Sequence, residues 1–224
     1  MVTTISFFKY RTNKFWAFKQ MYLAFELLSK VPGLNFFKLL GTGAGAGFSL
    51  YPDFGTYSIL CVWKDRLSAD DFINKSDHSM LISKKAFSRD DYFLNPIHSH
   101  GKWDGLNPFK GDNIPLNKSK KIAIITRASL NFSKLFEFWR SVPKASKAIK
   151  NASGVVWFKG IGELPFIQQA TFSIWNNIES VTDFAYKNKN HAEIVKKTRQ
   201  RNWYKEDLFA RFEIIDKQTK VFKN

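Results

Sequence analysis

The sequence predicts an α+β fold in which two tandem ferredoxin-like domains pack as a pseudo-dimeric α+β barrel. One observation is an internal repeat, because the segment from Trp63 to Phe72 (WKDRLSADDF) returns from Trp175 to Phe184 as WNNIESVTDF. The two copies lie half a chain length apart in a chain of 224 residues, which indicates duplicated domains. The other observation is the order of elements in each half: strand, helix, two strands, helix, strand, which is the ferredoxin-like order.

The N-terminal domain, 1–97, begins with a strand and a helix. Thr3–Tyr10 is β-branched and aromatic, which is typical of a strand. Asn13 is placed to cap a helix that ends before the Pro-Gly pair at 32–33. The apolar residues of this helix recur at helical spacing, which predicts that they face the core: Phe15, Phe18, Tyr22, Phe25 and Leu28.

A second helix and three further strands complete this domain. Ser68 and Asp71 form a capping-box pattern that opens the helix. The strands are predicted at Phe36–Leu40, Gly55–Trp63 and Asp91–Ile97. The segment 98–117 that follows is rich in Gly, Pro, Asn and His, so it is predicted to be a linker.

The C-terminal domain, 118–224, repeats this order. Ser133 and Ser180 are predicted to open its two helices, and the second helix is expected to be interrupted at Asn188–Asn190 before it continues. Its strands are predicted at Lys121–Leu130, Val155–Lys159, Gln168–Trp175 and Leu208–Ile215. Sheets of two such domains can pack into one barrel with the helices outside, which leaves one cavity per half between sheet and helices.

Composition limits the classes of partner and compartment. Hydrophobic residues make up 44% of the chain and aromatic residues 17%, enough for a core and for an apolar pocket. The net charge of +16 favours binding to a polyanion such as an anionic membrane surface. The sequence contains no nucleic-acid-binding motif, so nucleic acid is not expected as a partner. We expect a cytoplasmic protein, in part at the inner membrane surface, because the chain shows neither a signal peptide nor an apolar run of about 20 residues.

Several familiar kinds of site are not supported by the sequence. Cys61 is the only cysteine, so neither an intrachain disulfide nor a cysteine metal cluster is possible. The glycine-rich segment Gly41–Gly47 fits a variant of the dinucleotide fingerprint, but no helical period follows it, which argues against a nicotinamide site. His98 and His100 could bind a metal, but nothing completes a ligand set around them.

Blocks along nearly the whole chain resemble the spheroidene monooxygenase family. They include Trp16-Ala-Phe-Lys-Gln-Met21, Lys38-Leu-Leu-Gly-Thr-Gly43, Gly160-Ile-Gly-Glu163, Gln169-Ala-Thr-Phe-Ser-Ile-Trp175 and Trp203-Tyr-Lys-Glu-Asp-Leu-Phe-Ala-Arg-Phe212. This chain departs from the bacterial carotenoid enzymes in its richness in Lys and Asn, and Tyr204 stands where Phe is expected.

The resemblance implies a haem protein that oxygenates an end group of an acyclic carotenoid by hydroxylation or ketolation. It also implies haem b (iron) as cofactor, an apolar carotenoid-like substrate and an external electron donor. The fold it implies is the dimeric α+β barrel, shared with chlorite dismutases, dye-decolorising peroxidases and aldoxime dehydratases.

His191 is the predicted axial ligand of the haem iron. It precedes Ile194 and Val195 on a predicted helix in the C-terminal half, and these two apolar residues are expected to line the cofactor. In related haem barrels the axial histidine comes from a helix of the C-terminal domain. His78 holds the corresponding place in the first half and is interpreted as a relic, so one haem per chain is expected.

Three further residues are candidates for the site. Arg127 lies in an apolar strand and could pair with a haem propionate or hydrogen-bond the iron-bound oxygen. Gln169 and Ser173 share one face of the strand 168–175 and are catalytic candidates. Two alternatives stay open at this point: a haem-dependent dehydratase of the aldoxime dehydratase type, and a non-enzymatic protein that binds haem or another apolar ligand.

Overall fold

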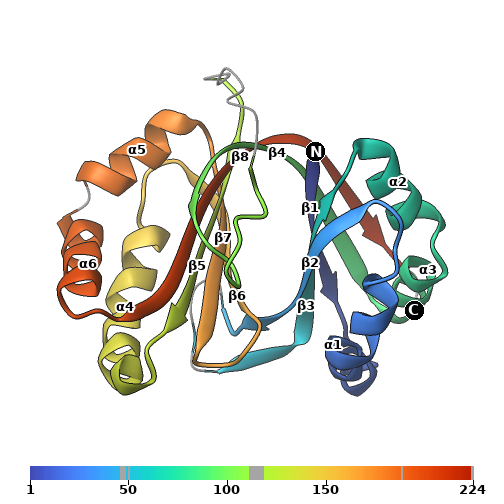
Figure 1. The fold of residues 1–224 in the computed structure, drawn as a ribbon, viewed down its shortest axis with the longest axis horizontal. Coiled ribbons are helices and arrows are strands. Elements are labelled where there is room, and N and C mark those ends of the chain that lie inside the picture. Colours follow the sequence, from blue (N-terminus) through green and yellow to red (C-terminus); the bar gives the residue numbers. More distant parts are fainter. Residues whose placement is uncertain (46–48, 50, 111–118, 188, 223–224) are drawn as a thin grey trace.

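The computed structural model describes residues 1–45, 49, 51–110, 119–187 and 189–222, without the side chains of 189–191. Within these residues the strands close into one antiparallel barrel, and the helices lie outside it in two groups (Figure 1). This arrangement confirms the prediction of a mixed α+β fold built around a barrel.

Each half of the chain runs through the predicted order of elements. The first half contains β1 (Val2–Lys9), α1 (Lys14–Leu28), β2 (Leu34–Gly43), β3 (Pro52–Trp63), α2 (Arg66–Lys75), α3 (Asp77–Lys85) and β4 (Ser88–Gly101). The second contains β5 (Ile122–Leu130), the short 3₁₀ helix η1 (Phe132–Lys134), α4 (Leu135–Lys150), β6 (Val155–Gly162), β7 (Gln168–Trp175), α5 (Ile178–Lys187), α6 (Lys189–Gln200) and β8 (Tyr204–Val221).

Two seams join the halves into the barrel, whose strand order is β1-β3-β2-β6-β7-β5-β8-β4. One seam is short, because β2 meets β6 only at Gly41 and Thr42. The other is long, because β4 and β8 pair from Ser88 to Gly101. Closure leaves no free sheet edge to attract another strand.

The predicted linker 98–117 is partly strand. Residues 98–101 belong to β4, since β8 extends far enough to pair with them. Beyond them, Trp103 and Phe109 are fully buried in the barrel core, so residues 102–110 close one end of the barrel and do not form a free connector. Residues 111–117 lie outside the part that the structure describes.

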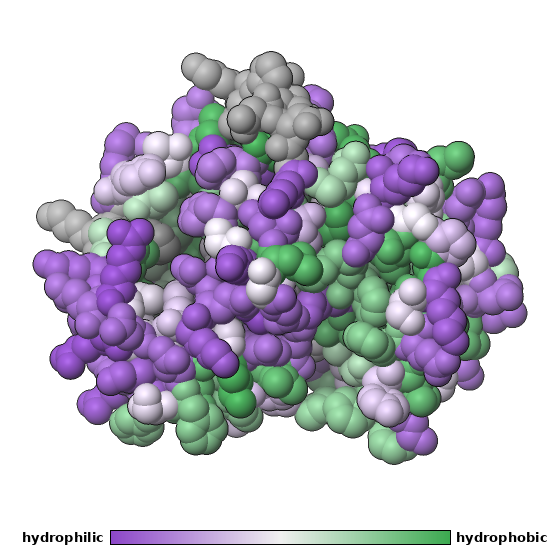
Figure 2. Space-filling model, viewed as in Figure 1, coloured by the Kyte–Doolittle hydropathy of each residue, from purple (hydrophilic) through white to green (hydrophobic). Residues whose placement is uncertain are grey.

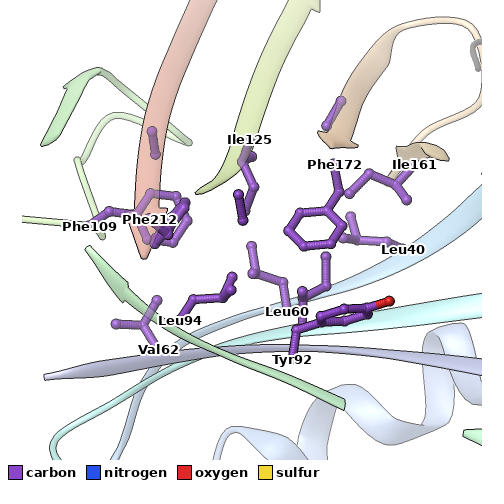
Figure 3. Close-up of a cluster of buried hydrophobic side chains, with 14 of the residues drawn as sticks. Leu40, Leu60, Val62, Tyr92, Leu94, Phe109, Ile125, Ile161, Phe172 and Phe212 are labelled. Atoms are coloured by element: carbon purple, nitrogen blue, oxygen red, sulfur yellow. The ribbon is translucent and has the colours of Figure 1, made fainter. Parts of the chain in front are cut away.

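Apolar side chains fill the barrel interior. Ile125, Phe172 and Phe212 from the second half meet Leu60 and Leu94 from the first (Figure 3). A group of four rings packs beside them with centroids 5.0–6.3 Å apart: Phe7, Tyr92, Trp157 and Phe172. The barrel is therefore a packed core, and a large ligand must bind elsewhere.

The prediction for the apolar face of α1 is right for Leu28 and wrong for its four aromatic residues. The helix buries Ala17, Ala24 and Leu28, and turns its aromatic residues outward. Phe15 is 71% exposed, Phe18 53%, Tyr22 82% and Phe25 62%. Small side chains on the inner side let the helix lie close to β2 and β3, so the spacing of the aromatic residues marks the outer side.

The helix starts also differ from their predictions. Asn13 precedes α1 without a side-chain capping bond, and Ser133 lies within η1, ahead of α4. Asp65, not Ser68, caps α2, because its carboxylate accepts a hydrogen bond from the Ser68 backbone N–H at 2.8 Å. Asn177 holds the same place before α5 and accepts from the Ser180 N–H at 2.9 Å. In both cases the serine is the third helical residue, and its backbone N–H donates to the side chain of the cap residue.

His78 and its surroundings close the space between sheet and helices in the first half. One hydrophobic cluster runs over this outer face, from Tyr10 and Trp63 to Phe72 and Ile82. A buried ion pair between Arg89 and Asp91, with Nε–Oδ1 at 2.7 Å, seals its polar part. Members of this polar group also bond to Ser6 and Ser79.

Replacing His78 by leucine is expected to flatten the pH dependence of stability. Burial, and then the Arg89 charge, lowers the pKa of the His78 imidazole below its ordinary 6.5, so the folded chain binds fewer protons than the unfolded chain near that pH. This contribution to stability is therefore present above pH 6.5 and lost as the pH falls below it. Urea unfolding between pH 7.5 and 5 tests this, with exposed His98→Leu as control; equal slopes in wild type and His78→Leu would contradict it.

Candidate functional site

The outer face of the barrel in the second half is packed incompletely. Helices α4, α5 and α6 cover this face (Figure 1). Where the first half has one hydrophobic cluster, the second half has two separate ones. One joins Ala128 and Leu130 to α4, and the other joins Ile122 and Ile124 to α5. The helices thus contact both ends of the face and leave its middle less covered.

Thr126 marks this gap. It lies in β5, a central strand of the barrel, between Thr171 of β7 and Phe209 of β8, and it is exposed. The matching position in the first half is Ser6, because each lies four residues after the strand residue paired with the repeated tryptophan. Ser6 is only 5% exposed. The two halves therefore differ at equivalent positions, and the second half is open.

Arg211 of β8 lies on the same outer face as Thr126. Its Nε atom is buried and has no hydrogen-bond partner among the described residues. Burial lowers the pKa of the Arg211 guanidinium, and the nearby Tyr186 side chain only partly opposes this. A half-buried guanidinium whose Nε–H has no acceptor is costly, so this position suits a negatively charged ligand group.

Sequence reasoning did not single out Arg211. The signal was available, because Arg211 interrupts an apolar run in the predicted strand 208–215, as Arg127 interrupts another. Strand alternation then separates the two arginines: Arg211 shares the outer side with Phe209, while Arg127 shares the inner side with Ile125.

Arg127 lies inside the barrel, where it is 3% exposed, and its charge is already paired. Its guanidinium bonds to Glu206 and, at 3.1 Å, to Asp104. Glu163 belongs to the same network, since it accepts from Trp103 Nε1 at 2.8 Å and from Lys38 Nζ at 2.6 Å. This network holds the loop 102–110 across the barrel end.

The other predicted residues lie on the outer side with the gap. Ser173 is 4% exposed and accepts a hydrogen bond from Trp175 Nε1 at 3.0 Å. Gln169 is two positions before Thr171 on the same side of β7, nearer the strand start. Ile194 of α6 packs against the cluster that contains Trp139 and Trp203, and Val195 is 36% exposed.

His191 lies in the first turn of α6, and its side chain is outside the described part of the chain. The structure brings position 191, Ile194 and Val195 together on one helix over the outer face. It places Arg127 on the opposite side of the sheet, so Arg127 and α6 do not border one space.

Two hollows open near this region. The first, of about 310 Å³, lies between the β2–β3 and β6–β7 connections; it is lined mainly by apolar groups, including Phe18, Phe54 and Phe166, and it reaches Gln169. The second, of about 390 Å³, lies between α4 and α6 and is rimmed by charged residues that pair across it, such as Lys144 with Glu193 at 2.6 Å.

His98 and His100 are neighbours on the outer side of β4. Their ring centroids are 5.9 Å apart, and His100 stacks on Phe209 at 5.3 Å. Since β4 pairs His98 with Arg211, this pair of histidines borders the gap around Thr126.

In the described residues, no helix is long and apolar enough to cross a bilayer.

Solved structures resemble the chain in fold. The crystal structure of an aldoxime dehydratase superposes with a TM-score of 0.61 over 96% of this chain and 81% of that one, at 10% identity. A second aldoxime dehydratase structure, in complex with butyraldoxime, gives 0.60 over 97% and 80%, also at 10% identity. At this identity the likeness establishes the barrel fold alone.

Sequence relatives are closer, although no protein-family model matches the chain. A spheroidene monooxygenase of Cereibacter sphaeroides is 36% identical over 215 residues, which are 95% of this chain and 66% of that protein, so the chain spans about two thirds of its length. Spheroidene monooxygenases of Rhodobacter capsulatus (28% identical; 96% of this chain, 90% of that one) and Rubrivivax gelatinosus (30% identical; 81% and 69%) also match. The chain belongs to the spheroidene monooxygenase family, a family of oxidoreductases.

Proposed function

We propose that this chain is a haem-dependent monooxygenase that hydroxylates or ketolates an end group of an acyclic carotenoid. The names of the relatives support the reaction class and the kind of substrate. The single observation that carries the cofactor proposal is the gap around Thr126, since an exposed threonine on a central strand shows that the helices leave this part of the outer face uncovered.

The residues around the gap fit a haem. A haem needs a donor to its iron, apolar walls and a partner for its propionates. Position 191 lies one helical turn before Ile194, whose side chain packs toward the sheet. Arg211, whose Nε atom has no partner in the described part of the chain, supplies a cation on the sheet beneath.

Each residue then has a distinct role. His191 would bind the iron, Ile194 and Val195 would cover the macrocycle, and Arg211 would pair with a propionate. The haem would supply the activation of dioxygen for insertion of oxygen into a C–H bond. A separate electron donor would provide the electrons. Arg127 has its charge neutralised inside the barrel and is assigned to holding the loop 102–110.

The chain orients the substrate along β7. The hollow of about 310 Å³ reaches Gln169 at the start of this strand, and Thr171 and Ser173 follow on the same side, beside the gap. A linear polyene could therefore run from the hollow toward Thr126 with its end group at the cofactor. The Ser173 hydroxyl, fixed by Trp175, would orient a polar end group, and the aromatic residues of the hollow would exclude water.

We also infer that the two halves descend from one duplicated ferredoxin-like unit, with domains 1–97 and 118–224. The shared order of elements and the matched positions of Ser6 and Thr126 support this. In this view the first half filled its cavity with the Arg89–Asp91 pair and His78, and the second half kept it open.

An absorption spectrum of haem-supplied protein, with and without dithionite, tests the proposal. We expect a Soret band, one haem per chain by pyridine haemochrome titration, and conversion of an acyclic carotenoid when dioxygen and reductant are present. A Soret band with conversion of an aldoxime but no carotenoid would instead favour the dehydratase alternative. Absence of any Soret band would leave a non-haem protein and contradict the proposal.

Replacing Arg211 by leucine is expected to weaken haem binding by about tenfold or more, because a charge-assisted hydrogen bond contributes roughly 1.5–3 kcal/mol. Fluorescence titration of the apoprotein with hemin measures this. Arg199→Leu, at an exposed position of α6, is the matched control and should bind haem as the wild type does. Unchanged affinity of the Arg211 variant would remove this residue from the site.

A further inference from the structure

The aromatic residues on the outer side of α1 form part of a larger exposed apolar surface. Phe54 of β3 is 55% exposed and its ring contacts Phe18 at 6.3 Å. Phe166, in the β6–β7 connection, is 45% exposed. We call this set the aromatic surface; it consists of Phe15, Phe18, Tyr22, Phe25, Phe54 and Phe166.

The second half adds aromatic residues at the corresponding place. Phe132 of η1 is 80% exposed and Phe136 of α4 is 81% exposed. The chain reaches the starts of α1 and α4 from the same end of the barrel, so both groups lie at the lower edge in Figure 1. Hydrophobic residues gather along that edge in the space-filling view (Figure 2).

This exposure is unusual for a protein surface. Single exposed apolar residues are common, but contiguous ones mark a binding surface. Four large aromatic side chains of α1 face outward, while Ala17, Ala24 and Leu28 are its buried residues, so packing of the core does not explain the four. Aromatic side chains of this kind suit the boundary between water and lipid, where rings partition well.

The charge of the α1 segment that carries most of the aromatic surface is positive, and the neighbouring carboxylates of Glu26 and Asp53 are paired with lysines. Residues 11–25 contain Arg11, Lys14 and Lys19 and no acidic residue. Lys19 lies over the Phe15 ring with its Nζ atom 4.6 Å from the centroid, so cation and ring are presented together. Basic residues beside exposed aromatic residues fit an anionic lipid surface.

The hollow that reaches Gln169 opens within the aromatic surface. Phe18, Phe54 and Phe166 belong both to the surface and to the lining of this hollow. A molecule that enters from this side therefore meets mainly apolar groups on its way to the start of β7, although Asp53 and Glu163 also line the hollow.

We propose that the aromatic surface docks on an anionic lipid bilayer and places the mouth of this hollow against the lipid. The biological purpose rests on the proposed function, because an apolar carotenoid would then pass from bilayer to protein without crossing water. The docking itself requires neither haem nor substrate.

A second copy of this chain fits the aromatic surface less well. A symmetric contact through α1 would place Lys14 and Lys19 of one copy near those of the other. Each chain also carries a net charge of +16, so two copies repel each other, whereas an anionic bilayer attracts each of them. Charge complementarity thus favours the lipid.

Sedimentation with lipid vesicles tests the proposal on the full chain. We expect binding to vesicles of phosphatidylcholine with 30% phosphatidylglycerol (about a third anionic lipid), with at least about tenfold weaker binding to pure phosphatidylcholine. Raising the salt from about 0.05 M to 0.5 M should weaken binding to the anionic vesicles, because the Debye length shortens. Failure of the wild type to bind anionic vesicles would overturn the proposal.

The triple variant Phe15→Ser/Phe18→Ser/Tyr22→Ser removes apolar area without touching the core, so its thermal unfolding should match the wild type. Its binding to anionic vesicles should fall by about tenfold or more. The control Leu67→Ser/Met80→Ser, on α2 and α3, removes exposed apolar residues elsewhere and should bind as the wild type does. Equal losses in both variants, or no loss in either, would overturn the proposal.

Light scattering after gel filtration tests whether a second copy of this chain, and not a bilayer, covers the aromatic surface. If the wild type is a dimer that the triple variant converts to a monomer, while neither binds vesicles, the surface is a contact between copies and the proposal is wrong. Because these assays need no cofactor, a protein that binds vesicles but shows no Soret band would refute the proposed function and keep the docking surface.

Discussion

Replacing His191 by alanine is expected to abolish the Soret band of the haem-supplied protein. Helix α6 packs over the outer face through Ile194, and the strong donor that this helix offers at its first turn is the imidazole at position 191. Without an axial donor the iron loses its bond to the protein, and only the contacts of Arg211 and the apolar walls remain. Haem should then be lost on gel filtration, with a drop in haem content from one per chain to nearly none.

Lys196→Ala, at an exposed position of the same helix, controls for effects on α6 and should keep the full band. Adding imidazole to His191→Gly should partly restore the band, because free imidazole can fill the space and bind the iron. Retention of an unchanged band in His191→Ala would show that another residue binds the iron. His98 and His100, which border the same gap from β4, would then be the first to test.

The repeat and the strand pattern predicted most of the architecture. β7 was predicted with its observed bounds, and β1 and β5 to within one residue at each end. The other five strands are longer than predicted, because barrel pairing extends strands past the residues whose composition indicates them. For example, residues 98–101 and 216–221 are polar, but they belong to β4 and β8, which pair with each other. Local composition cannot reveal a partner that is distant in sequence.

The orientation of single elements was harder to predict. The helical spacing of Phe15, Phe18, Tyr22 and Phe25 indicates one face of a helix but does not say whether the core or a lipid surface lies on that side. Alanines on the other side of α1 were the sign that this helix packs closely by its small residues. The prediction relied on the spacing of the aromatic residues and did not consider the alanines.

The two strand arginines illustrate the limit for the site. Arg127 and Arg211 each interrupt an apolar strand, and the sequence offers no direct means to decide which one faces the barrel interior. The decision depends on the register of β5 and β8, which sets Arg127 beside Glu206 and Asp104 and leaves Arg211 on the outer side. Once one residue of β8, such as Phe212, is known to face the barrel interior, the alternation of side chains along the strand places Arg211 on the outer side.

Replacing Arg127 by leucine is expected to lower the free energy of unfolding by about 3 kcal/mol, because breaking a largely buried ionic network leaves its carboxylates unpaired. Although burial acts to raise it, the pKa of the Glu206 carboxyl is lowered by the backbone N–H groups of Gly105 and Asp104 and by Arg127. The loss of Arg127 therefore removes the positive charge that keeps this carboxylate favourable at the barrel end. Urea unfolding measures the change.

The double variant Arg127→Leu/Glu206→Leu separates this role from a role in haem binding. Removing both charges should cost less than the two single changes together, with a coupling of at least about 1 kcal/mol. Lys205→Leu, at an exposed neighbouring position of β8, should leave stability within about 0.5 kcal/mol of wild type. The haem affinity of Arg127→Leu should stay close to that of the wild type, because the sheet lies between Arg127 and α6. If that affinity instead fell as far as in Arg211→Leu, while stability did not change, Arg127 would belong to the cofactor site and the two strand arginines would have to exchange roles.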